Sequence, residues 1–407
     1  MKAIWKSYLD ASLILKITIA LILGIAVGLV FGEDAAVLAP FGDLLLSLLT
    51  FLIIPLILFT MIVGINQTKI GNLGRMGGKV FLYYTFSSAF AIMVGLAVAS
   101  LFQPGTGMQL DGSETFDVPE NPGFVSVLLN IVPSNIFTAF TELNLLGIIF
   151  TAFAFGIAIS YMRSSSELGD LGSHIYKTVD ALNEATLLVL KVILQYVPVG
   201  VFAIMAETVG SQGLDTLFSL GEMVLVLYAA LAVQIAVYTV LLILFKIKPG
   251  TFYKHARTPM ITAFVTQSSS GTLPLTLNAA KNLGLSKSLY GFSLPLGATI
   301  NMDGAAIRIA ISAVFAANLV GDPLSLPDML MVVLVGTLAS IGTAGVPGAG
   351  IVMIATVFVQ LGLPMEAVAL LTAIDALVGM GCTALNITGD LVGTTLIDQN
   401  EKKRKTT

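Results

Sequence analysis

Long apolar runs alternate with short polar connectors along the first part of the chain. Four of these runs are each long enough to cross a hydrocarbon core about 30 Å thick: 14–31, 44–65, 80–102 and 223–245. The pattern predicts helices over these ranges: 13–32, 42–68, 78–102, 123–161 (broken near Pro133), 174–206 and 217–246. A polar connector is expected at 162–173.

The pattern changes after Lys254, where Gly, Ser, Thr, Asn and Asp begin to interrupt the apolar runs. Two interruptions are typical of hairpin tips: 266–274, where the apolar arms on either side are too short to span, and 340–350. After each tip we expect a helix that contains its own polar patch: 289–319, around Asn301 and Asp303, and 366–395, around Asn386 and Asp390. Non-helical backbone is tolerated at membrane depth only where protein or water surrounds it. This repeated pattern, without strong identity between its halves, indicates an internal repeat of the kind found in transporters.

Composition and charge support a membrane protein. The chain is 56% hydrophobic and only 11% charged, whereas soluble domains contain about 25% charged residues. Lysines and arginines cluster near both ends of the chain, while the loop 103–123 contains none and has four acids. By the positive-inside rule, we expect both termini in the cytoplasm, the acidic loop outside and an even number of crossings of the cell (inner) membrane.

The sequence also excludes several function classes. A single cysteine, Cys382, excludes a disulfide within the chain and a cysteine-built metal site. The two histidines, His174 and His255, lack metal-ligand spacing. We find no nucleophile–base set, phosphate-binding loop or nucleic-acid-binding stripe, so we expect neither an enzyme nor a nucleic-acid partner.

Asp303 and Asp390 are the candidate cation ligands. Asp303 lies in a glycine-broken polar patch between two apolar runs, and a charge at bilayer depth costs about 3 kcal/mol. A bound cation, completed by freed backbone carbonyls, is the usual solution in transporters. Asn386 and Asp390 are four residues apart, on one helical face. Oxygen ligands suit hard cations, and two acids favour Na⁺ over Ca²⁺; the alternative is that each Asp only caps a helix half.

Hydroxyl groups form two further candidates. Tyr84, Ser87 and Ser88 lie on one helical face, where helix–helix hydrogen bonding is the simpler interpretation. The run Ser268–Ser270 offers hydroxyls and backbone N–H groups suited to holding a carboxylate. A serine run is otherwise typical of a linker, but apolar arms flank this one.

Arg308 is the only Lys or Arg between Lys287 and Lys402. It lies too deep in a predicted membrane helix to reach the interface, so it needs an anionic partner. It would either clamp an anionic substrate or form an internal salt bridge with one of three acids: Asp303, Asp375 or Asp390.

Four ordered motifs give the chain its resemblance to a known family: TQSSSGTLP, NMDG, SIGTAGVPGAG and NITGD. With them, nearly the whole chain resembles the dicarboxylate/amino acid:cation symporter family, which includes the glutamate transporters. The resemblance implies an all-α membrane protein with eight transmembrane helices, two re-entrant helical hairpins, internal repeats, a homotrimer in lipid and an elevator mechanism in which 340–350 forms part of a moving gate. It also implies scaffold helices in 11–70 and 123–206, and a transport domain made of 78–102 and 217–398.

Carried over by position, the resemblance assigns three sodium sites and a substrate site. The sodium ligands are Tyr84, Ser87, Ser88, Asn301 and Asp303; then Asn301, Asn386 and Asp390; then carbonyls of Thr299, Ser340, Ile341 and Thr343, with Met302 alongside. By the resemblance, the substrate carboxylate would meet Ser269, Ser270 and Asn386. We expect Arg308, where relatives usually have an uncharged residue, to supply a positive charge from a different helix. The full set of expected substrate residues is Ser268, Ser269, Ser270, Arg308, Thr343, Gly345, Val346, Gly379, Cys382, Thr383 and Asn386.

This chain departs from the family at the substrate. Where relatives have an Asp for the substrate amine it has Gly379, and where acidic amino-acid carriers have an Arg it has Cys382 or, in the first hairpin, Gln267. The Thr after NMDG is Ala305. An α-ammonium would be poorly paired in such a dry site. We therefore expect a sodium-driven symporter of a small organic anion, such as a dicarboxylate. The alternatives are a neutral or acidic amino-acid carrier of the same family or, in another class, a gated ion channel.

Overall fold

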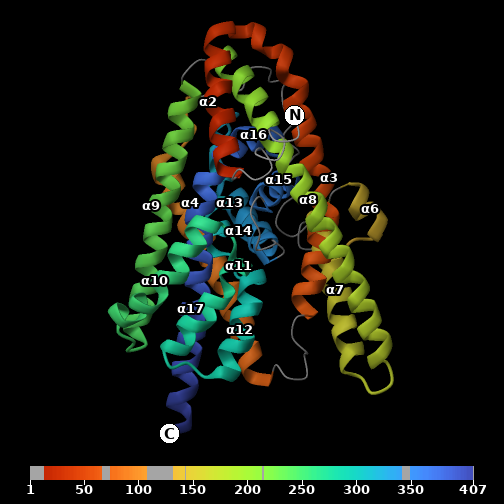
Figure 1. The fold of residues 1–407 in the computed structure, drawn as a ribbon, viewed down its shortest axis with the longest axis vertical. Coiled ribbons are helices and arrows are strands. Elements are labelled where there is room, and N and C mark those ends of the chain that lie inside the picture. Colours follow the sequence, from red (N-terminus) through yellow and green to blue (C-terminus); the bar gives the residue numbers. More distant parts are fainter. Residues whose placement is uncertain are drawn as a thin grey trace, which may run out of the picture.

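The computed structural model describes residues 13–66, 74–107, 132–142, 144–212, 215–341 and 349–406. Within these ranges the chain forms helices and no strands (Figure 1). The predicted all-α class is therefore confirmed.

One group of helices is built on a single long helix. The group comprises α2 (Leu13–Phe31), the 3₁₀ helix η1 (Gly32–Leu38), α3 (Ala39–Asn66), the short α6 (Ile136–Thr141), α7 (Leu145–Ser164) and the 44-residue α8 (Gly169–Gln212). α2 and α3 pack along α8, and α7 packs against both α3 and α8. Gly28 allows the close approach of α2, because a Cβ there would lie 2.6 Å from the Ala206 carbonyl oxygen of α8.

The second group surrounds a buried central helix. It comprises α4 (Gly74–Phe102), α9 (Asp215–Leu244), α10 (Pro249–Thr266), α11 (Ser269–Asn282), α12 (Lys287–Ile300), α13 (Asp303–Leu319), α14 (Leu326–Ile341), α15 (Ala349–Leu361), α16 (Met365–Ala373) and α17 (Asp375–Thr406). α4, α9, α14 and α17 all pack against α13. Sixteen of the 17 residues of α13 are buried, so it is the core of this group.

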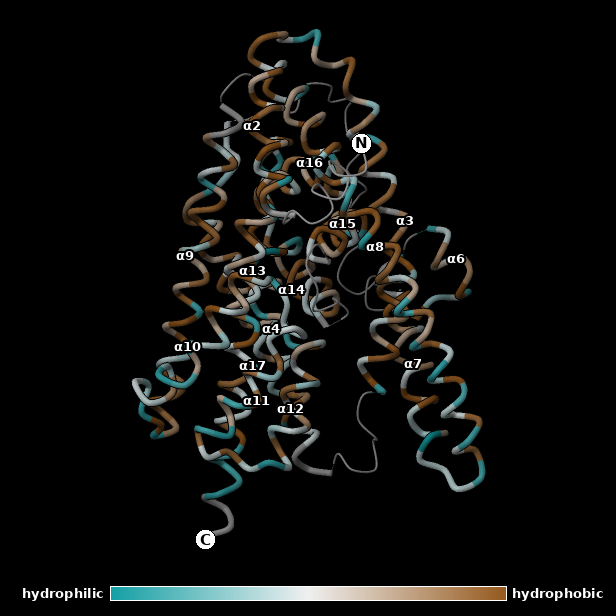
Figure 2. The backbone as a smooth tube through the Cα atoms, in the orientation of Figure 1, coloured by the Kyte–Doolittle hydropathy of each residue, from teal (hydrophilic) through white to brown (hydrophobic). Residues whose placement is uncertain are grey.

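The described residues contain seven helical segments that are long and apolar enough to cross a membrane. The first, Leu15–Asn66, is 52 residues long and includes both α2 and α3. Figure 2 shows hydrophobic residues along the outer helices and hydrophilic ones at the C-terminal end of α17 and at the α7–α8 turn. These segments agree with an integral membrane protein, whereas the number of crossings stays a prediction.

Most predicted helices are confirmed to within a few residues, but two connections differ. The polar connector predicted at 162–173 is present but shorter, at 165–168, since α7 runs to Ser164 and α8 already begins at Gly169. The predicted helix 123–161 is interrupted twice in its described part, because Asn135 and Asn144 each cap a new helix. Their side chains accept hydrogen bonds from the Phe137 and Gly147 backbone N–H groups. Residues 123–131 lie outside the described ranges.

The first predicted hairpin tip is shorter than expected. α10 and α11 pack against each other, and the turn between them comprises only Gln267 and Ser268. The Ser268 Oγ accepts a hydrogen bond from the Gly271 backbone N–H at 3.0 Å, so it caps α11 and the helix begins at once. Of the second tip, residues 342–348 lie outside the described ranges, between α14 and α15.

The two predicted polar-broken helices behave differently. The first is broken at Asn301 and Met302, between α12 and α13, as expected. The second, predicted at 366–395, is broken at Ile374 instead, and its polar residues Asn386 and Asp390 lie inside the unbroken α17. Their side chains find partners at Asn301, in the break between α12 and α13, and at Gly304, in the first turn of α13, so the helical backbone has no need to open.

Candidate functional site

Asp303 is a fully buried carboxylate that collects hydroxyl groups from two other helices. It is the first residue of α13 and has 0% exposure. The Ser87 hydroxyl of α4 donates to Oδ2 at 2.5 Å, and the Ser88 hydroxyl donates to Oδ1 at 3.1 Å. The Tyr238 hydroxyl of α9 also donates to Oδ2. No lysine or arginine in the described ranges forms an ion pair with this carboxylate.

Asp390, the second acid, lies beside the break between α12 and α13. The Asn301 Nδ2 donates to Asp390 Oδ1 at 2.9 Å. The other amide atom of this asparagine, Oδ1, is buried and has no hydrogen-bond partner among the described residues. A buried acceptor without a donor is costly, and a cation is one kind of partner that would satisfy this oxygen.

Two glycines allow the acids to approach the helix backbones. A Cβ on Gly389 would lie 2.7 Å from the Tyr238 hydroxyl oxygen and 2.8 Å from Asp303 Oδ2. A Cβ on Gly297 would lie 2.4 Å from Asp390 Oδ1. The two carboxylates therefore occupy space that any side chain at these positions would take.

The chemistry of this cluster fits an alkali cation. Its polar atoms are carboxylate, amide and hydroxyl oxygens, which are the ligands of hard cations. The described residues contain no group of three or more His, Cys, Asp or Glu side chains arranged for a metal. Two acids and one orphaned amide oxygen therefore suit Na⁺ better than a divalent ion.

The remaining predicted sodium ligands lie around this cluster. The Tyr84 hydroxyl donates to the Ser293 carbonyl of α12 at 2.8 Å rather than to an acid. The Thr299 and Ser340 hydroxyls donate to carbonyls of their own helices. The resemblance assigns the backbone carbonyls of these two residues, and not their hydroxyls, as sodium ligands. Met302 is buried at the break. Ile341 ends α14, and its side chain, like residue Thr343, lies outside what the structure describes.

We call the polar side chains around the two acids the cation cluster: Asp303, Asp390, Asn301, Ser87, Ser88 and Tyr238. Next to it, α13 and α17 pack closely against each other. The Asn386 Oδ1 accepts hydrogen bonds from the Gly304 N–H at 2.7 Å and the Ala305 N–H at 3.4 Å. A Cβ on Gly304 would lie 2.2 Å from the Cys382 carbonyl oxygen. The face of α17 that contains Cys382 and Asn386 is thereby held against the start of α13.

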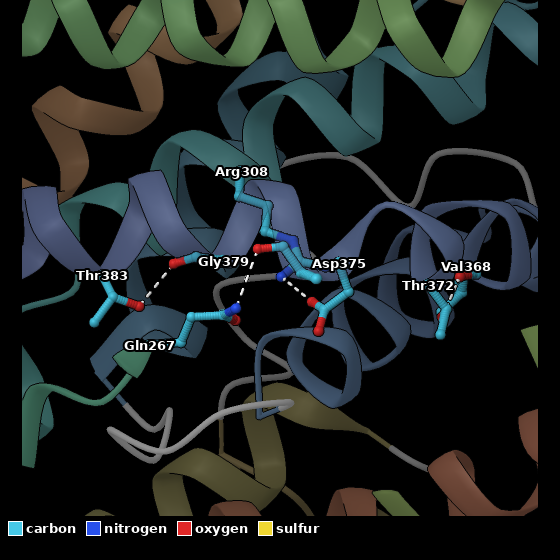
Figure 3. A network of polar contacts seen from close by, with 8 residues as sticks. Gln267, Arg308, Val368, Thr372, Asp375, Gly379 and Thr383 are labelled. Atoms are coloured by element: carbon cyan, nitrogen blue, oxygen red, sulfur yellow. Dashed lines mark hydrogen bonds and ion pairs between the residues drawn. The ribbon is translucent and has the colours of Figure 1, made fainter. Parts of the chain in front are cut away.

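Arg308 forms a buried ion pair with Asp375, the first residue of α17 (Figure 3). Its Nη1 lies 2.6 Å from Asp375 Oδ1, and each residue is 4% exposed. The internal salt bridge is therefore present, with Asp375 rather than Asp303 or Asp390. The Arg308 Nε is buried without a hydrogen-bond partner among the described residues. A Cβ on Gly350 would lie 2.7 Å from Nη1, so the guanidinium also reaches the start of α15.

Gln267 fills the space beside Gly379. Its Oε1 lies 2.5 Å from the position of a Cβ at residue 379, and its Nε2 donates to the Ala376 carbonyl oxygen at 3.2 Å. Figure 3 shows Gln267, Arg308 and Asp375 gathered along the first turns of α17, with Thr383 bonded to the Gly379 carbonyl. The Gln267 amide thus joins the first hairpin tip to α17, at the place where the resemblance would put an acid.

The other predicted substrate residues lie around this network. Ser268 caps α11, Ser269 is buried and Ser270 is exposed, all at the first hairpin tip. Cys382 is a buried thiol. Thr343, Gly345 and Val346 lie outside the described ranges.

Tyr238 is the contact that the sequence analysis missed. It lies near the C-terminal end of α9, an apolar helix to which we assigned no site residue. One signal was available: Gln234 and Tyr238 are four apart in that apolar run, so both polar side chains lie on one face. Both are buried.

Comparisons with known proteins identify the family of the chain. Residues 13–400 match the model of the sodium:dicarboxylate symporter family. The chain belongs to the sodium:dicarboxylate symporter family. The resemblance inferred from the four motifs is therefore confirmed.

Similar members of the sodium:dicarboxylate symporter family include proteins named for two kinds of substrate. One is the proton/sodium-glutamate symport protein of Geobacillus stearothermophilus, 32% identical over 96% of each chain. Another is the C4-dicarboxylate transport protein of Deinococcus radiodurans, 32% identical over 96% of this chain and 89% of the relative. These names describe transporters rather than enzymes, so the protein is an integral membrane transporter, and the family name implies sodium coupling.

Proposed function

We propose that the protein is a sodium-coupled symporter that imports a small organic anion, a dicarboxylate or a related carboxylate. The observation on which this rests is the position of the Arg308 guanidinium. It is buried, its Nε lacks a hydrogen-bond partner among the described residues, and it lies on the same helix as Asp303. The two positions are five residues apart, about 7.5 Å along the axis.

An unpartnered guanidinium N–H in a buried site favours an anionic ligand. Arg presents five N–H donors in a fork that matches a carboxylate, and its ion pair with Asp375 uses only Nη1. A substrate carboxylate that accepts from Nε would remove an unsatisfied donor. The same α13 would then hold the cation at its first turn and the anion at its second, which couples the two binding events.

The polar network around Gly379 favours a substrate without an α-amine. An ammonium group in a dry site needs an acid, and the acid in this network, Asp375, is already paired with Arg308. At position 379, where the resemblance places an acid, the Gln267 amide occupies the space. A dicarboxylate fits these conditions better than an amino acid does.

For the transport cycle we propose an elevator mechanism in a homotrimer embedded in lipid. The packing supports a scaffold made of α2, α3, α7 and α8 and a transport domain made of α4 and α9–α17, because each group packs mainly within itself. In this arrangement eight helices span the cell membrane, α10–α11 and α14–α15 form re-entrant hairpins, and both termini are cytoplasmic.

A thermal-shift screen of the purified protein tests the proposal. Carboxylates with and without an α-amine would be added in NaCl and in choline chloride. We expect stabilisation by Na⁺, and a further shift by a dicarboxylate such as succinate only when Na⁺ is present. Equal stabilisation by succinate in choline would contradict sodium coupling.

An amino-acid symporter is the second candidate, because the glutamate symport relatives are as similar as the dicarboxylate ones. A substitution pair separates the two. Gly379→Asp would place a Cβ only 2.5 Å from Gln267 Oε1. The aspartate therefore fits only if the Gln267 side chain is removed, as in Gln267→Ala. We expect the double variant to bind aspartate about tenfold more tightly than wild type, because an ion pair then holds the amine.

Isothermal titration with aspartate and succinate measures this effect, with Gln267→Ala alone as the control. An aspartate affinity of the double variant equal to that of wild type would mean that an amine is not held near residue 379. Tight aspartate binding by the wild-type protein would favour the amino-acid carrier.

A further inference from the structure

α9 brings a buried hydroxyl to the cation cluster. Tyr238 is 1% exposed, and its hydroxyl donates to Asp303 Oδ2. α9 packs against α4, α13 and α17, the three helices that contribute Ser87, Asp303 and Asp390. Tyr238 therefore contacts the cluster from a fourth side.

The two carboxylate oxygens of Asp303 accept different numbers of hydrogen bonds. A carboxylate oxygen accepts through two lone pairs, and Oδ2 receives two donors, Ser87 and Tyr238. Oδ1 receives a single bond from Ser88 at 3.1 Å. One lone pair of Oδ1 therefore stays available, while Oδ2 is saturated.

The Tyr238 hydroxyl lies beside Gly389 together with side-chain atoms of Asp303 and Asn301. A Cβ on Gly389 would lie 2.7 Å from the Tyr238 hydroxyl, 2.8 Å from Asp303 Oδ2 and 3.2 Å from Asn301 Nδ2. These three side chains consequently meet at one point of α17. Asn301, whose buried Oδ1 has no hydrogen-bond partner among the described residues, is thus a neighbour of the carboxylate that Tyr238 holds.

We propose that Tyr238 is a positioning residue of the cation site. Its hydroxyl fixes the Asp303 carboxylate so that Oδ1 faces the cation, and it thereby sets the affinity for Na⁺ and the discrimination against Li⁺. Groups that orient the ligands of a metal ion typically change its affinity 10- to 100-fold when they are removed. This inference rests on the proposed sodium coupling.

Tyr238→Phe tests the inference, because it removes one oxygen and keeps the ring. The NaCl and LiCl concentrations that give half-maximal thermal stabilisation of the purified protein would be measured, without organic substrate. We expect the Na⁺ midpoint to rise about tenfold and the ratio of the Li⁺ to the Na⁺ midpoint to fall. Size-exclusion profiles and unfolding temperatures in choline chloride report whether the variant folds.

Tyr253→Phe is the matched control. The Tyr253 hydroxyl is hydrogen-bonded to Thr239 Oγ1 at 2.8 Å, so this change removes a tyrosine oxygen bonded to the residue next to Tyr238 without touching Asp303. We expect its Na⁺ midpoint to stay within twofold of wild type.

The outcomes separate this inference from the proposed function. A Tyr238→Phe variant with wild-type Na⁺ and Li⁺ midpoints overturns the inference, even if its unfolding temperature in choline falls, since that result assigns Tyr238 to packing alone. A wild-type protein that Na⁺ does not stabilise overturns the proposed function instead.

Discussion

Replacing Asp390 by Asn is expected to lower the affinity for Na⁺ about 100-fold and to leave little sodium-dependent uptake. Asp390 is buried and accepts a hydrogen bond from Asn301 Nδ2 at 2.9 Å. The substitution keeps the size of the side chain and removes its charge. Loss of one partner of a buried charged interaction costs about 2–5 kcal/mol, and each 1.4 kcal/mol is about tenfold in affinity.

Asp398→Asn is the control for this substitution. Asp398 is about two helical turns further along α17 and is engaged elsewhere, with the Ser286 N–H at 3.0 Å and Lys402 at 2.7 Å. Na⁺ titrations of uptake in proteoliposomes and of thermal stability would be made on both variants. Unchanged sodium dependence of Asp390→Asn would remove this residue from the cation site.

Removing the charge of Arg308 is expected to weaken binding of the organic anion about 100-fold or more. Truncating Arg308 alone would leave the Asp375 carboxylate buried and unpaired, which destabilises a protein by about 3–5 kcal/mol. The pair Arg308→Gln with Asp375→Asn avoids this, because both charges disappear together. The double variant should therefore fold, bind Na⁺ and fail to bind succinate, since a buried charge-assisted contact is lost.

Asp375→Asn alone separates the two roles of Arg308. It keeps the guanidinium and removes its internal partner, at a cost in stability similar to that of truncating Arg308, so a size-exclusion profile must first show that it folds. Succinate then supplies the missing carboxylate, and its binding, measured by titration calorimetry in NaCl, should persist. If the double variant bound succinate with wild-type affinity, Arg308 would be only one half of an internal ion pair, and the amino-acid carrier would become the better proposal.

The sequence predicted the parts of the site that have local signals. The break at Asn301 follows from a glycine-containing polar patch inside an apolar run, and the first hairpin from a serine–glycine tip with short arms. Asp303 and Asp390 were predicted from the cost of burying a charge in a membrane. Each of these inferences needs only neighbouring residues.

The rest depends on contacts between distant segments. The sequence offered three acids as partners of Arg308, and only the packing of α13 against the start of α17 selects Asp375. Tyr238 escaped prediction because its partner is 65 residues away. The position of the break before α17 also escaped, since Asn386 and Asp390 are hydrogen-bonded to residues at and just after the break between α12 and α13 and leave their own backbone intact.

Accumulation of succinate in proteoliposomes tests sodium-driven anion transport most directly. An inward NaCl gradient should drive uptake above equilibrium, and the Asp390→Asn variant under the same gradient should show uptake near background. Equal accumulation by the wild-type protein when choline replaces Na⁺, with no other gradient present, would contradict the central claim.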